Sequence, residues 1–442
     1  MKLHIYQAIN QFASSKPMRL GMPGHKGRLP LFKNYAKLDV TEYTALDVEV
    51  AVKKAEGDIA KILKTKYAKI LTNGSTLGIL AMIYAVKGRG KEIIINRTAH
   101  KSVYNALRLC GINPIIADFG FDNGLPVNPT VSETEKLLDM HPKAIGVLYT
   151  YPDYYGRVFE IKKISEILKA KNKLLLIDGA HGGHYAYTSD REYAGEYADV
   201  WVDGVHKNLP TLNQGALLLS SNEGLIPKLE EGLNLFATTS PSYPIMASVE
   251  YAVKHMNAHA ESQIERVEDV LAELKIKVAR AGVTFVETTD SLKLTLDFGG
   301  AGIDASWAEQ QLINKKIHCE LNDGRYLLFM FSVFTKSGEI KKLCRALLSI
   351  IKRANKTDVC MDKPHVEPQR RLKYLVAIED SGEYVDLDNA IGKIAGDNAG
   401  LFPPCYPLVT AGEVIDERTA KLLKATNVFG VKDGKIKIVK DN

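Results

Sequence analysis

The sequence predicts an α/β protein built on a mostly parallel β-sheet. Between about residues 50 and 220, short apolar runs alternate with amphipathic helical stretches, of which Ile161–Ala170 is the clearest example. Strands that alternate with helices in this way form parallel sheets that are covered on both faces. The strands that we expect are Glu92–Ile95, Pro114–Asp118, Ala144–Tyr149, Leu174–Ile177, Val200–Asp203 and Ala216–Leu219.

Length and composition indicate a globular protein of more than one domain. The chain has 442 residues, of which 45% are hydrophobic and 25% charged, a balance that allows a full core to be buried. The net charge of +6 is small, and the lysines are scattered, which argues against a nucleic-acid partner. No apolar run approaches the roughly 18 residues that a membrane span needs, and the N-terminus lacks the apolar core of a signal peptide. The expected location is the cytoplasm.

The five cysteines support the same location. They lie far apart and form no CxxC pair, which argues against a disulfide framework and against a structural zinc site. The spacing therefore fits a reducing compartment.

The chain beyond the parallel sheet predicts further, smaller domains. A long helical region, Ile245–Val278, precedes strand patterns near Val283–Glu287, Leu292–Asp297 and Tyr326–Phe331. The polar stretch Arg353–Pro368 is a plausible linker. The expected parts are an N-terminal arm (1–45), a large domain that includes the long helix (46–282), a small α+β domain (283–352) and a C-terminal domain (364–442).

The first candidate site feature is a Gly/Ser/Thr turn. Leu71–Thr76 leads directly into the apolar helical run Leu77–Val86. The N-terminus of a helix offers unpaired N–H groups and the positive end of the helix dipole, which suits a phosphate. The alternative is an ordinary helix cap made by the same residue types.

The second feature is an apolar strand that ends in a carboxylate, Leu174–Asp178. Ligands of parallel sheets bind at the carboxyl ends of the strands, so Asp178 is placed to meet the ring nitrogen of a cofactor. The small residues that follow, Gly179, Ala180, Gly182 and Gly183, would let a flat ring approach the backbone. The alternative is a strand-end Asp that caps a turn.

The third feature is another apolar strand, which runs into His206 and Lys207. Most lysines are solvated. A lysine at the mouth of a sheet is instead partly buried, which favours its neutral amine and makes it a nucleophile able to form a Schiff base.

Together these features supply what a pyridoxal-phosphate (PLP) enzyme needs: a phosphate cup, a lysine for the aldehyde and a carboxylate for the pyridinium nitrogen. A competing interpretation is a metal site, made by His181 and His184 with Asp178, His206 and His100. The HxxH spacing on a Gly-rich turn lacks the helical geometry of zinc motifs, so we expect no metal. A nucleotide-binding protein is disfavoured because neither GxGxxG nor GxxxxGK[ST] occurs.

Nearly the whole chain resembles the fold-type-I PLP decarboxylases that act on ornithine, lysine and arginine, in their short bacterial form. The matching segments are Met22–Lys26 (PGHK), Asp39–Glu42 (D-[IV]-T-E), Asn73–Thr76 (NGST), Arg97–Ser102 (RNxHKS), Thr150 with Pro152, Tyr155 and Gly156 (TSPTYYG), Asp178–His184 (DEAHGAH), His206–Lys207 (the end of S-x-H-K), Thr239–Tyr243 (TSPSY), and Phe402–Pro404 with Pro407, Leu408, Gly412 and Glu413 (YPPGIPLLxPGE).

The resemblance implies an aspartate-aminotransferase fold, with a mostly parallel seven-stranded sheet in the large domain and smaller α+β domains after it. It also implies PLP-dependent decarboxylation of a basic amino acid by a homodimer with shared active sites. The catalytic residues would be Lys207, Asp178, His100 and His206, with His206 or Lys207 returning a proton to Cα. The cofactor would be bound by Asn73, Gly74, Ser75, Thr76, His100 (stacked on the ring), Asp178, Ala180, His206 and Lys207, and from the partner by Thr239 and Ser240. The substrate would be bound by His184, Tyr155 and Glu413.

Several positions depart from the family pattern. Gly204 replaces the serine of S-x-H-K, which removes a phosphate hydroxyl, and Gly179 replaces a glutamate beside the site. Residues 46–49 read LDVE where LDDL is expected, and the C-terminal motif has Cys405-Tyr406 for Gly-Ile and Ala411 for Pro. Two alternatives therefore stay open: another PLP reaction on this scaffold, such as transamination or lyase chemistry, and a PLP-binding regulatory homologue.

Overall fold

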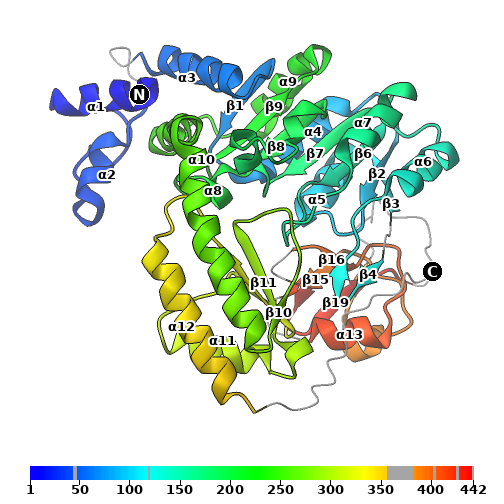
Figure 1. Ribbon diagram of the computed structural model, residues 1–442. Helices are drawn as coiled ribbons and strands as arrows, with labels where there is room; N and C mark the ends of the chain where they lie inside the picture. The colour runs from blue at the N-terminus through cyan, green and yellow to red at the C-terminus, as the bar shows by residue number, and fades with distance from the viewer. Residues whose placement is uncertain (43–46, 118–119, 356–381, 402–404, 425–427, 441–442) are drawn as a thin grey trace. The chain divides into compact units, whose positions relative to one another are not determined.

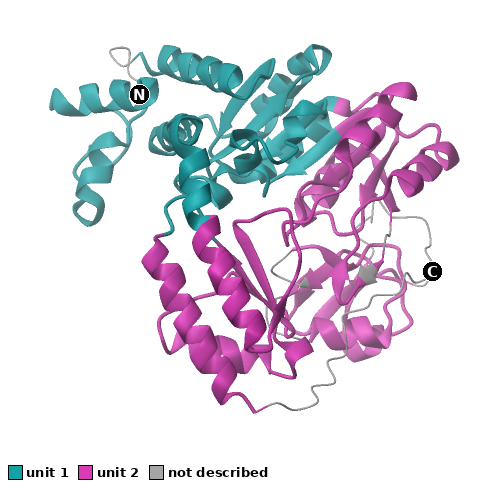
Figure 2. Ribbon diagram, in the orientation of Figure 1, with its two compact units in different colours: residues 1–85, 176–267, 331–335 teal, residues 86–175, 268–330, 336–442 magenta. Residues whose placement is uncertain are grey.

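The structure, a computed structural model, describes residues 1–42, 47–117, 120–355, 382–401, 405–424 and 428–440 (Figure 1). Phe402–Pro404, Leu46 and most of the expected linker lie outside the described residues. The chain forms two compact units, each assembled from segments far apart in sequence: residues 1–85, 176–267 and 331–335, and residues 86–175, 268–330 and 336–442 (Figure 2). The division into four parts expected from the sequence stays a prediction.

The main sheet has seven strands in the order β1-β9-β8-β7-β6-β2-β3. Strand β7 is parallel to β8, and β2 is parallel to β3 and to β6, whereas β9 is antiparallel to both of its neighbours. The strands are β1 (Tyr67–Leu71), β2 (Glu92–Asn96), β3 (Asn113–Ala117), β6 (Gly146–Thr150), β7 (Leu174–Gly179), β8 (Val200–Asp203) and β9 (Ala216–Ser220). The predicted fold class, α/β with a mostly parallel seven-stranded sheet and smaller sheets, is confirmed.

Two details of the sheet differ from expectation. Strand β1 was not predicted, because Lys69 interrupts its apolar pattern; its ammonium lies 3.4 Å from Glu56. The connection from β7 to β8 contains the short 3-10 helices η2 (Gly183–Tyr187) and η3 (Ala194–Glu196) in place of a crossover α-helix.

In the first unit, helix α4 packs against strand β8. A Cβ atom at Gly78 would lie 2.8 Å from a methyl group of Val202, so this glycine allows the helix to approach the strand. All residues of β8 and β9 are buried. The helices of this unit are α1 (His4–Ser14), α2 (Lys33–Leu38), α3 (Val48–Ile62), α4 (Gly74–Val86, whose last residue belongs to the second unit), α8 (Val205–Asn208) and α9 (Ile226–Phe236). The expected long helix is α10 (Tyr243–Arg280), which has residues in both units.

The second unit contains the remaining helices and the small sheets. Its smaller sheets have the orders β10-β11-β13-β12, β14-β19-β18, β16-β15-β17 and β4-β5. The helices are α5 (Lys101–Cys110), α6 (Val131–Met140), α7 (Ile161–Ala170), α11 (Ala305–Ile313), α12 (Ser337–Arg353) and α13 (Glu417–Leu423). The strands are β4 (Phe121–Asp122), β5 (Leu125–Pro126), β10 (Thr284–Phe285), β11 (Lys293–Asp297), β12 (Leu321–Asn322), β13 (Tyr326–Met330), β14 (Glu383–Asp386), β15 (Ala399–Leu401), β16 (Pro407–Val409), β17 (Val428–Phe429), β18 (Val431–Lys432) and β19 (Lys435–Ile438).

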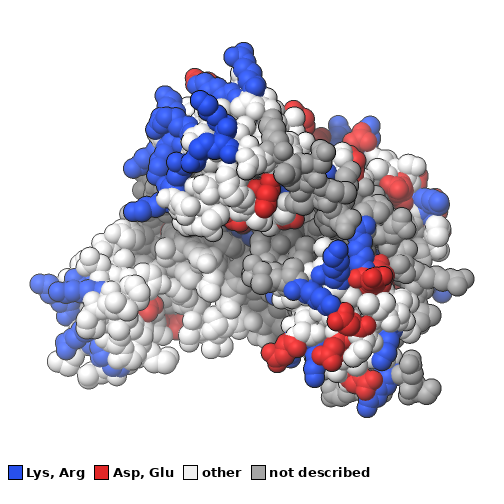
Figure 3. Space-filling model, turned by 90° about the horizontal axis from the view of Figure 1, so that it is seen from below, with Lys and Arg blue, Asp and Glu red and all other residues white. Residues whose placement is uncertain are grey.

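On the face that Figure 3 shows, the basic side chains of the described residues form separate groups, one of them interspersed with acidic side chains. Among the described helices, none is long and apolar enough to cross a bilayer.

Candidate active site

Lys207 lies on α8, directly after strand β8, and one partner of its side chain follows the neighbouring strand β7. Its Nζ is 3.1 Å from Nε2 of His181, a buried residue just after β7. Strands β7 and β8 are parallel, and Asp178 is in register with Val202. The carboxyl ends of both strands therefore bring Lys207, His181 and Asp178 to one edge of the sheet, as the sequence argument predicted for the lysine and the aspartate.

Asp178 is 3% exposed, and its environment acts on its pKa in two directions. Burial raises the pKa, while the positive charge of Lys207 and a hydrogen bond from the Ala180 N–H to Oδ1 (3.2 Å) lower it. The carboxylate is therefore held in an apolar setting next to a cation, which is the setting in which it can pair with a protonated ring nitrogen.

A small polar cradle lies beside this edge. Helix α4 begins at Gly74, whose φ of +67° is readily adopted only by glycine and whose N–H donates to the carbonyl of Gln214 (2.8 Å). Ser75 Oγ is buried and has no hydrogen-bond partner among the described residues. A Cβ atom at Gly204 would lie 3.0 Å from that Oγ and 2.5 Å from the carbonyl oxygen of Ala180, so the three residues adjoin.

The chemistry of this cradle fits a phosphate. A buried hydroxyl without a partner is costly and can donate to an anion, and the N-terminus of α4, which spans Gly74–Val86, adds N–H groups and dipole charge. Asn73 and Thr76, the other predicted phosphate residues, are exposed at the same turn.

His206 has a defined tautomer. Its Nδ1 lies 2.9 Å from the carbonyl oxygen of Gly215, and because a carbonyl only accepts, Nδ1 must carry the proton. Burial is the main cause that lowers the pKa of His206, so the neutral ring, with Nε2 as its acceptor, is favoured.

The other predicted residues of the first unit occupy contrasting environments. His184 is fully buried in η2, with its ring edge-on to Tyr185 at 4.7 Å between centroids. Thr239 and Ser240 are exposed, and the Ser240 N–H donates to Thr238 Oγ1 (3.2 Å).

His100 and Tyr155 lie in the second unit. His100 caps helix α5: the Ser102 N–H donates to its Nδ1 (3.2 Å), and Ser102 Oγ is 2.8 Å from the same atom. Tyr155 is buried, and its hydroxyl donates to Asp323 Oδ2 (3.3 Å). Burial raises the pKa of Tyr155 well above its ordinary value, so this phenol stays a neutral donor.

Glu413, also in the second unit, already has partners within its own chain. Its two carboxylate oxygens accept from Nη1 and Nη2 of Arg97 at 2.6 and 2.8 Å, and the Thr410 N–H donates to Oε2 (2.8 Å). The prediction that Glu413 binds the distal cation of a substrate is untested, but such a cation would have to share or displace Arg97.

Sequence reasoning missed one buried group near the candidate lysine. Asp203, the last residue of β8, is 2% exposed; the hydroxyl of Tyr193 donates to its Oδ2 (2.5 Å), and the Trp201 indole N–H donates to that hydroxyl (2.8 Å). Burial raises the pKa of Asp203 to about 7. The sequence could have indicated Asp203, because it is an aspartate at the end of an apolar strand. No local pattern indicates that Tyr193 is its partner.

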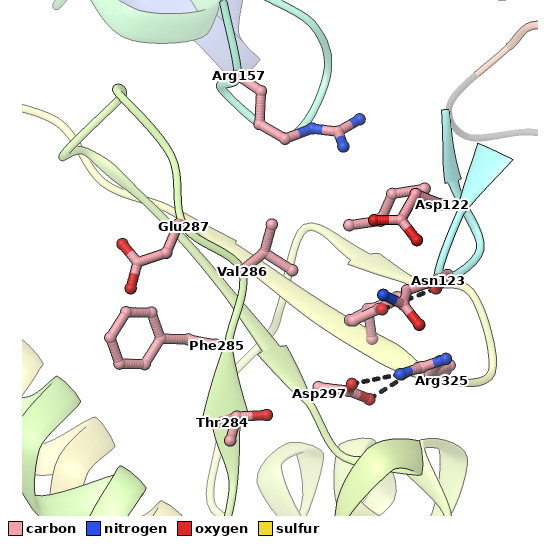
Figure 4. A pocket seen from close by; sticks show the side chains of 11 residues that line it. Asp122, Asn123, Arg157, Thr284, Phe285, Val286, Glu287, Asp297 and Arg325 are labelled. Carbon is pink, nitrogen blue, oxygen red and sulfur yellow. Dashed lines mark hydrogen bonds and ion pairs between the residues drawn. The ribbon is translucent and has the colours of Figure 1, made fainter. Parts of the chain in front are cut away.

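A surface pocket in the second unit is distinct from the predicted residues. Its charged lining includes Asp122, Arg157, Glu287 and the pair Asp297–Arg325, joined by hydrogen bonds of 2.9 and 2.6 Å (Figure 4). None of the predicted site residues lines it. Among the described residues, no cluster of three or more His, Cys, Asp or Glu is arranged to hold a metal ion.

Comparison with known proteins decides the family. A family model described as "Orn/Lys/Arg decarboxylase, major domain" matches residues 4–296, well over half of the chain. The chain belongs to the Orn/Lys/Arg decarboxylase family. The family expected from the sequence is thereby confirmed, and so is its class, the PLP-dependent amino-acid decarboxylases.

Several known proteins are similar to the chain over most of its length. The uncharacterized protein YaaO of Bacillus subtilis is 26% identical, over 96% of this chain and 94% of its own. Arginine decarboxylase of the same organism is 26% identical, over 93% of this chain and 91% of its own. The structure of a lysine decarboxylase from Francisella novicida has a TM-score of 0.81 at 17% identity, over 99% of this chain and 81% of its own.

Proposed function

We propose that this protein decarboxylates a basic amino acid (lysine, arginine or ornithine) with PLP held on Lys207. The observation that carries the proposal is the convergence of Lys207, Asp178 and the hydroxyl of Ser75 at one edge of the sheet. These groups match the aldehyde, the ring nitrogen and the phosphate of PLP, so the residues fit the cofactor.

Bound PLP supplies an electron-withdrawing ring that accepts the electron pair left when the Cα–carboxylate bond breaks. The protein supplies the rest. With PLP bound, Asp178 would hold a proton at the ring nitrogen, Ser75 and the N-terminus of α4 would bind the phosphate, and His100 would, by the family resemblance, stack on the ring. Orientation of the substrate selects the bond that breaks, because only a bond perpendicular to the ring overlaps its π system.

His181 assists Lys207. An ammonium must lose a proton before its nitrogen becomes a nucleophile, and the imidazole of His181, 3.1 Å from Nζ, can accept that proton. After CO₂ leaves, Cα must be reprotonated. The lowered pKa of His206 leaves little of its ring protonated near pH 7. Lys207, which can regain its proton from His181, would therefore be the preferred donor.

Substrate recognition and assembly complete the proposal. Tyr155, a buried neutral donor, and His184 are the candidates for contact with the amino acid. The related arginine decarboxylase of Bacillus subtilis supports a basic amino acid as the substrate. We further propose a cytoplasmic homodimer in which Thr239 and Ser240, both exposed, reach the phosphate of the partner's site.

The test is incubation of the purified protein and PLP with lysine, arginine and ornithine, followed by measurement of CO₂ and of cadaverine, agmatine and putrescine. Norleucine, which lacks the distal cation, is the substrate control and should react measurably but more slowly, and Lys207→Ala is the protein control. We expect CO₂ and one matching amine from the wild type alone. Transfer of the amino group to a keto acid, or cofactor binding without any turnover, would refute the proposed reaction.

A further inference from the structure

We infer that Glu413 acts in the reaction through Arg97, as a positioning residue for the segment that carries His100, and does not bind the distal cation of the substrate. The inference rests on the proposed function, in which His100 contacts the cofactor. It concerns residues of the second unit only.

The pair itself is complete without a substrate. Arg97 and Glu413 are 5% and 3% exposed, and they form two hydrogen bonds of 2.6 and 2.8 Å between guanidinium and carboxylate. The Thr410 N–H donates a third to Oε2 (2.8 Å). Both carboxylate oxygens are thus used. Displacing the guanidinium would leave a buried charge unpaired, which costs more than a substrate ammonium would recover.

Arg97 links two segments that are distant in sequence. It directly follows β2, and its Nη2 also donates to the carbonyl of Leu408 (3.0 Å). Four residues later, the Lys101 N–H donates to the carbonyl of Cys405 (2.9 Å). The loop of residues 97–101 is therefore fastened at both ends to residues 405–413, with His100 between the two attachments.

The ring of His100 has contacts within this loop and helix α5. Ser102 fixes the ring through Nδ1, and the hydroxyl of Tyr104 donates to the carbonyl of Arg97 (2.7 Å). These contacts set the angle of the ring relative to α5. The attachments to residues 405–413 hold the loop, together with the hydrogen bond from the Arg97 N–H to the carbonyl of Ala117 (2.8 Å). Loss of the carboxylate of Glu413 should therefore displace His100 from its place over the cofactor.

This role makes a specific kinetic prediction. A misplaced stacking residue slows every substrate alike, because it alters the cofactor that all substrates share. Loss of a substrate-binding carboxylate would instead act through the distal cation and would spare norleucine. The two roles differ in the ratio of kcat/KM between a basic amino acid and norleucine.

The experiment compares Glu413→Gln, Arg97→Gln and the double variant, all loaded with PLP. We measure kcat and KM for the preferred basic amino acid and for norleucine, and the visible circular dichroism of bound PLP, which reports the position of the ring. We expect both single variants to lose activity by up to about a hundredfold on both substrates. The ratio between substrates should stay constant, the double variant should lose no more than the worse single variant, and the cofactor band should change.

Two further variants keep the test decisive. Glu417→Gln, an exposed Glu→Gln change four residues away, should alter nothing. If either Gln variant fails to fold, Arg97→Lys replaces it. This variant keeps the charge pair and the carboxylate of Glu413 but loses the bidentate geometry. It should still lower the activity on both substrates and change the circular-dichroism band of PLP.

The inference fails if Glu413→Gln lowers kcat/KM for the basic amino acid while sparing norleucine, or if the Arg97 variants leave activity and the band unchanged. If the wild type turns over no basic amino acid, the proposed function fails. The circular dichroism of the cofactor then still decides whether Glu413 and Arg97 position His100.

Discussion

A Cβ atom at Gly204 would lie 2.5 Å from the carbonyl oxygen of Ala180, closer than any side chain tolerates. The family motif has serine at this position, and the sequence alone indicated only that a hydroxyl is missing. The structure adds that the backbones of the two strand ends approach too closely for any side chain. Ser75 Oγ lies 3.0 Å from the position of that Cβ atom, so the cradle still has the hydroxyl of Ser75.

Gly204→Ser should therefore harm the protein although it restores the family residue. The Ala180 carbonyl belongs to the backbone and must shift, which should lower the free energy of unfolding by about 1–3 kcal/mol. The Kd for PLP should rise, because the shift also moves Ser75. Urea unfolding and a PLP titration measure both effects. Gly57→Ser, where a Cβ meets nothing within 4 Å, is the control. If Gly204→Ser binds PLP more tightly and unfolds with an unchanged free energy, the site has room for the serine hydroxyl and the explanation by close backbone approach is wrong.

Lys207→Ala should abolish covalent attachment of the cofactor. Wild-type protein with PLP should be yellow, and borohydride should fix a pyridoxyl group on the peptide that contains Lys207, as mass spectrometry will show. Lys228→Ala, on the exposed side of α9, should keep the label. A colourless wild-type protein that binds zinc would refute PLP as the cofactor and favour the histidines around Asp178.

Asp178→Ala should separate attachment from turnover. Lys207 supplies the amine, so PLP should still be fixed by borohydride. Turnover should fall by roughly a hundredfold to a thousandfold, because the partner of the protonated ring nitrogen is lost. Asp190→Ala, an exposed Asp, is the control. Near-normal kcat in a well-folded Asp178→Ala protein would show that the ring nitrogen has another partner.

Asp203 should make the protein less stable as the pH rises. Its pKa is raised to about 7 in the folded state from an ordinary value of 3.8, so the folded protein holds a proton that the unfolded chain has lost. Stability due to this group is therefore greatest below pH 4 and is lost between pH 4 and 7, by up to about 4 kcal/mol. Asp203→Asn should remove this loss. Its free energy of unfolding relative to the wild type should rise across that window and then level off.

Urea unfolding at pH 4.5, 6 and 8 measures this difference, and subtraction of the wild-type curve removes the groups that both proteins share. Asn can still accept from the hydroxyl of Tyr193, so the contact is kept. Asp190→Asn should show no such change. If the difference between Asp203→Asn and the wild type is independent of pH, Asp203 is ionised in the folded protein throughout.

The sequence predicted what depends on local pattern and failed where partners are distant. Strand β8 and helix α7 match their expected bounds residue for residue, since apolar runs and helical spacing define them. The convergence of Lys207 and Asp178 followed from the rule for strand ends. The pair Arg97–Glu413 joins residues 316 positions apart, and no periodicity indicates such a contact. His181, a partner of Lys207, was weighed only as a metal ligand, because the rule for strand ends places backbones and does not determine which side chains touch.

The active site should be shared across a two-fold dimer. Thr238, Thr239 and Ser240 are exposed, while Tyr243, just beyond them, is buried and donates to Glu42 (2.5 Å). The base of the segment is thus fixed, and its polar tip is available to a second copy. Because Gly204 contributes no hydroxyl to the phosphate, a hydroxyl from the partner should matter more.

Two inactive variants test this arrangement: Lys207→Ala and Ser240→Trp, dissociated together and allowed to reassociate. If Ser240 serves the partner's site, each mixed dimer has one site with both Lys207 and Ser240 intact. Random pairing makes half of the dimers mixed, so about a quarter of the wild-type sites should return. Lys207→Ala reassociated with itself is the control and should stay inactive. If Ser240 serves its own subunit, every site in the mixture carries one defect, and a verified mixed dimer without activity would refute the shared site.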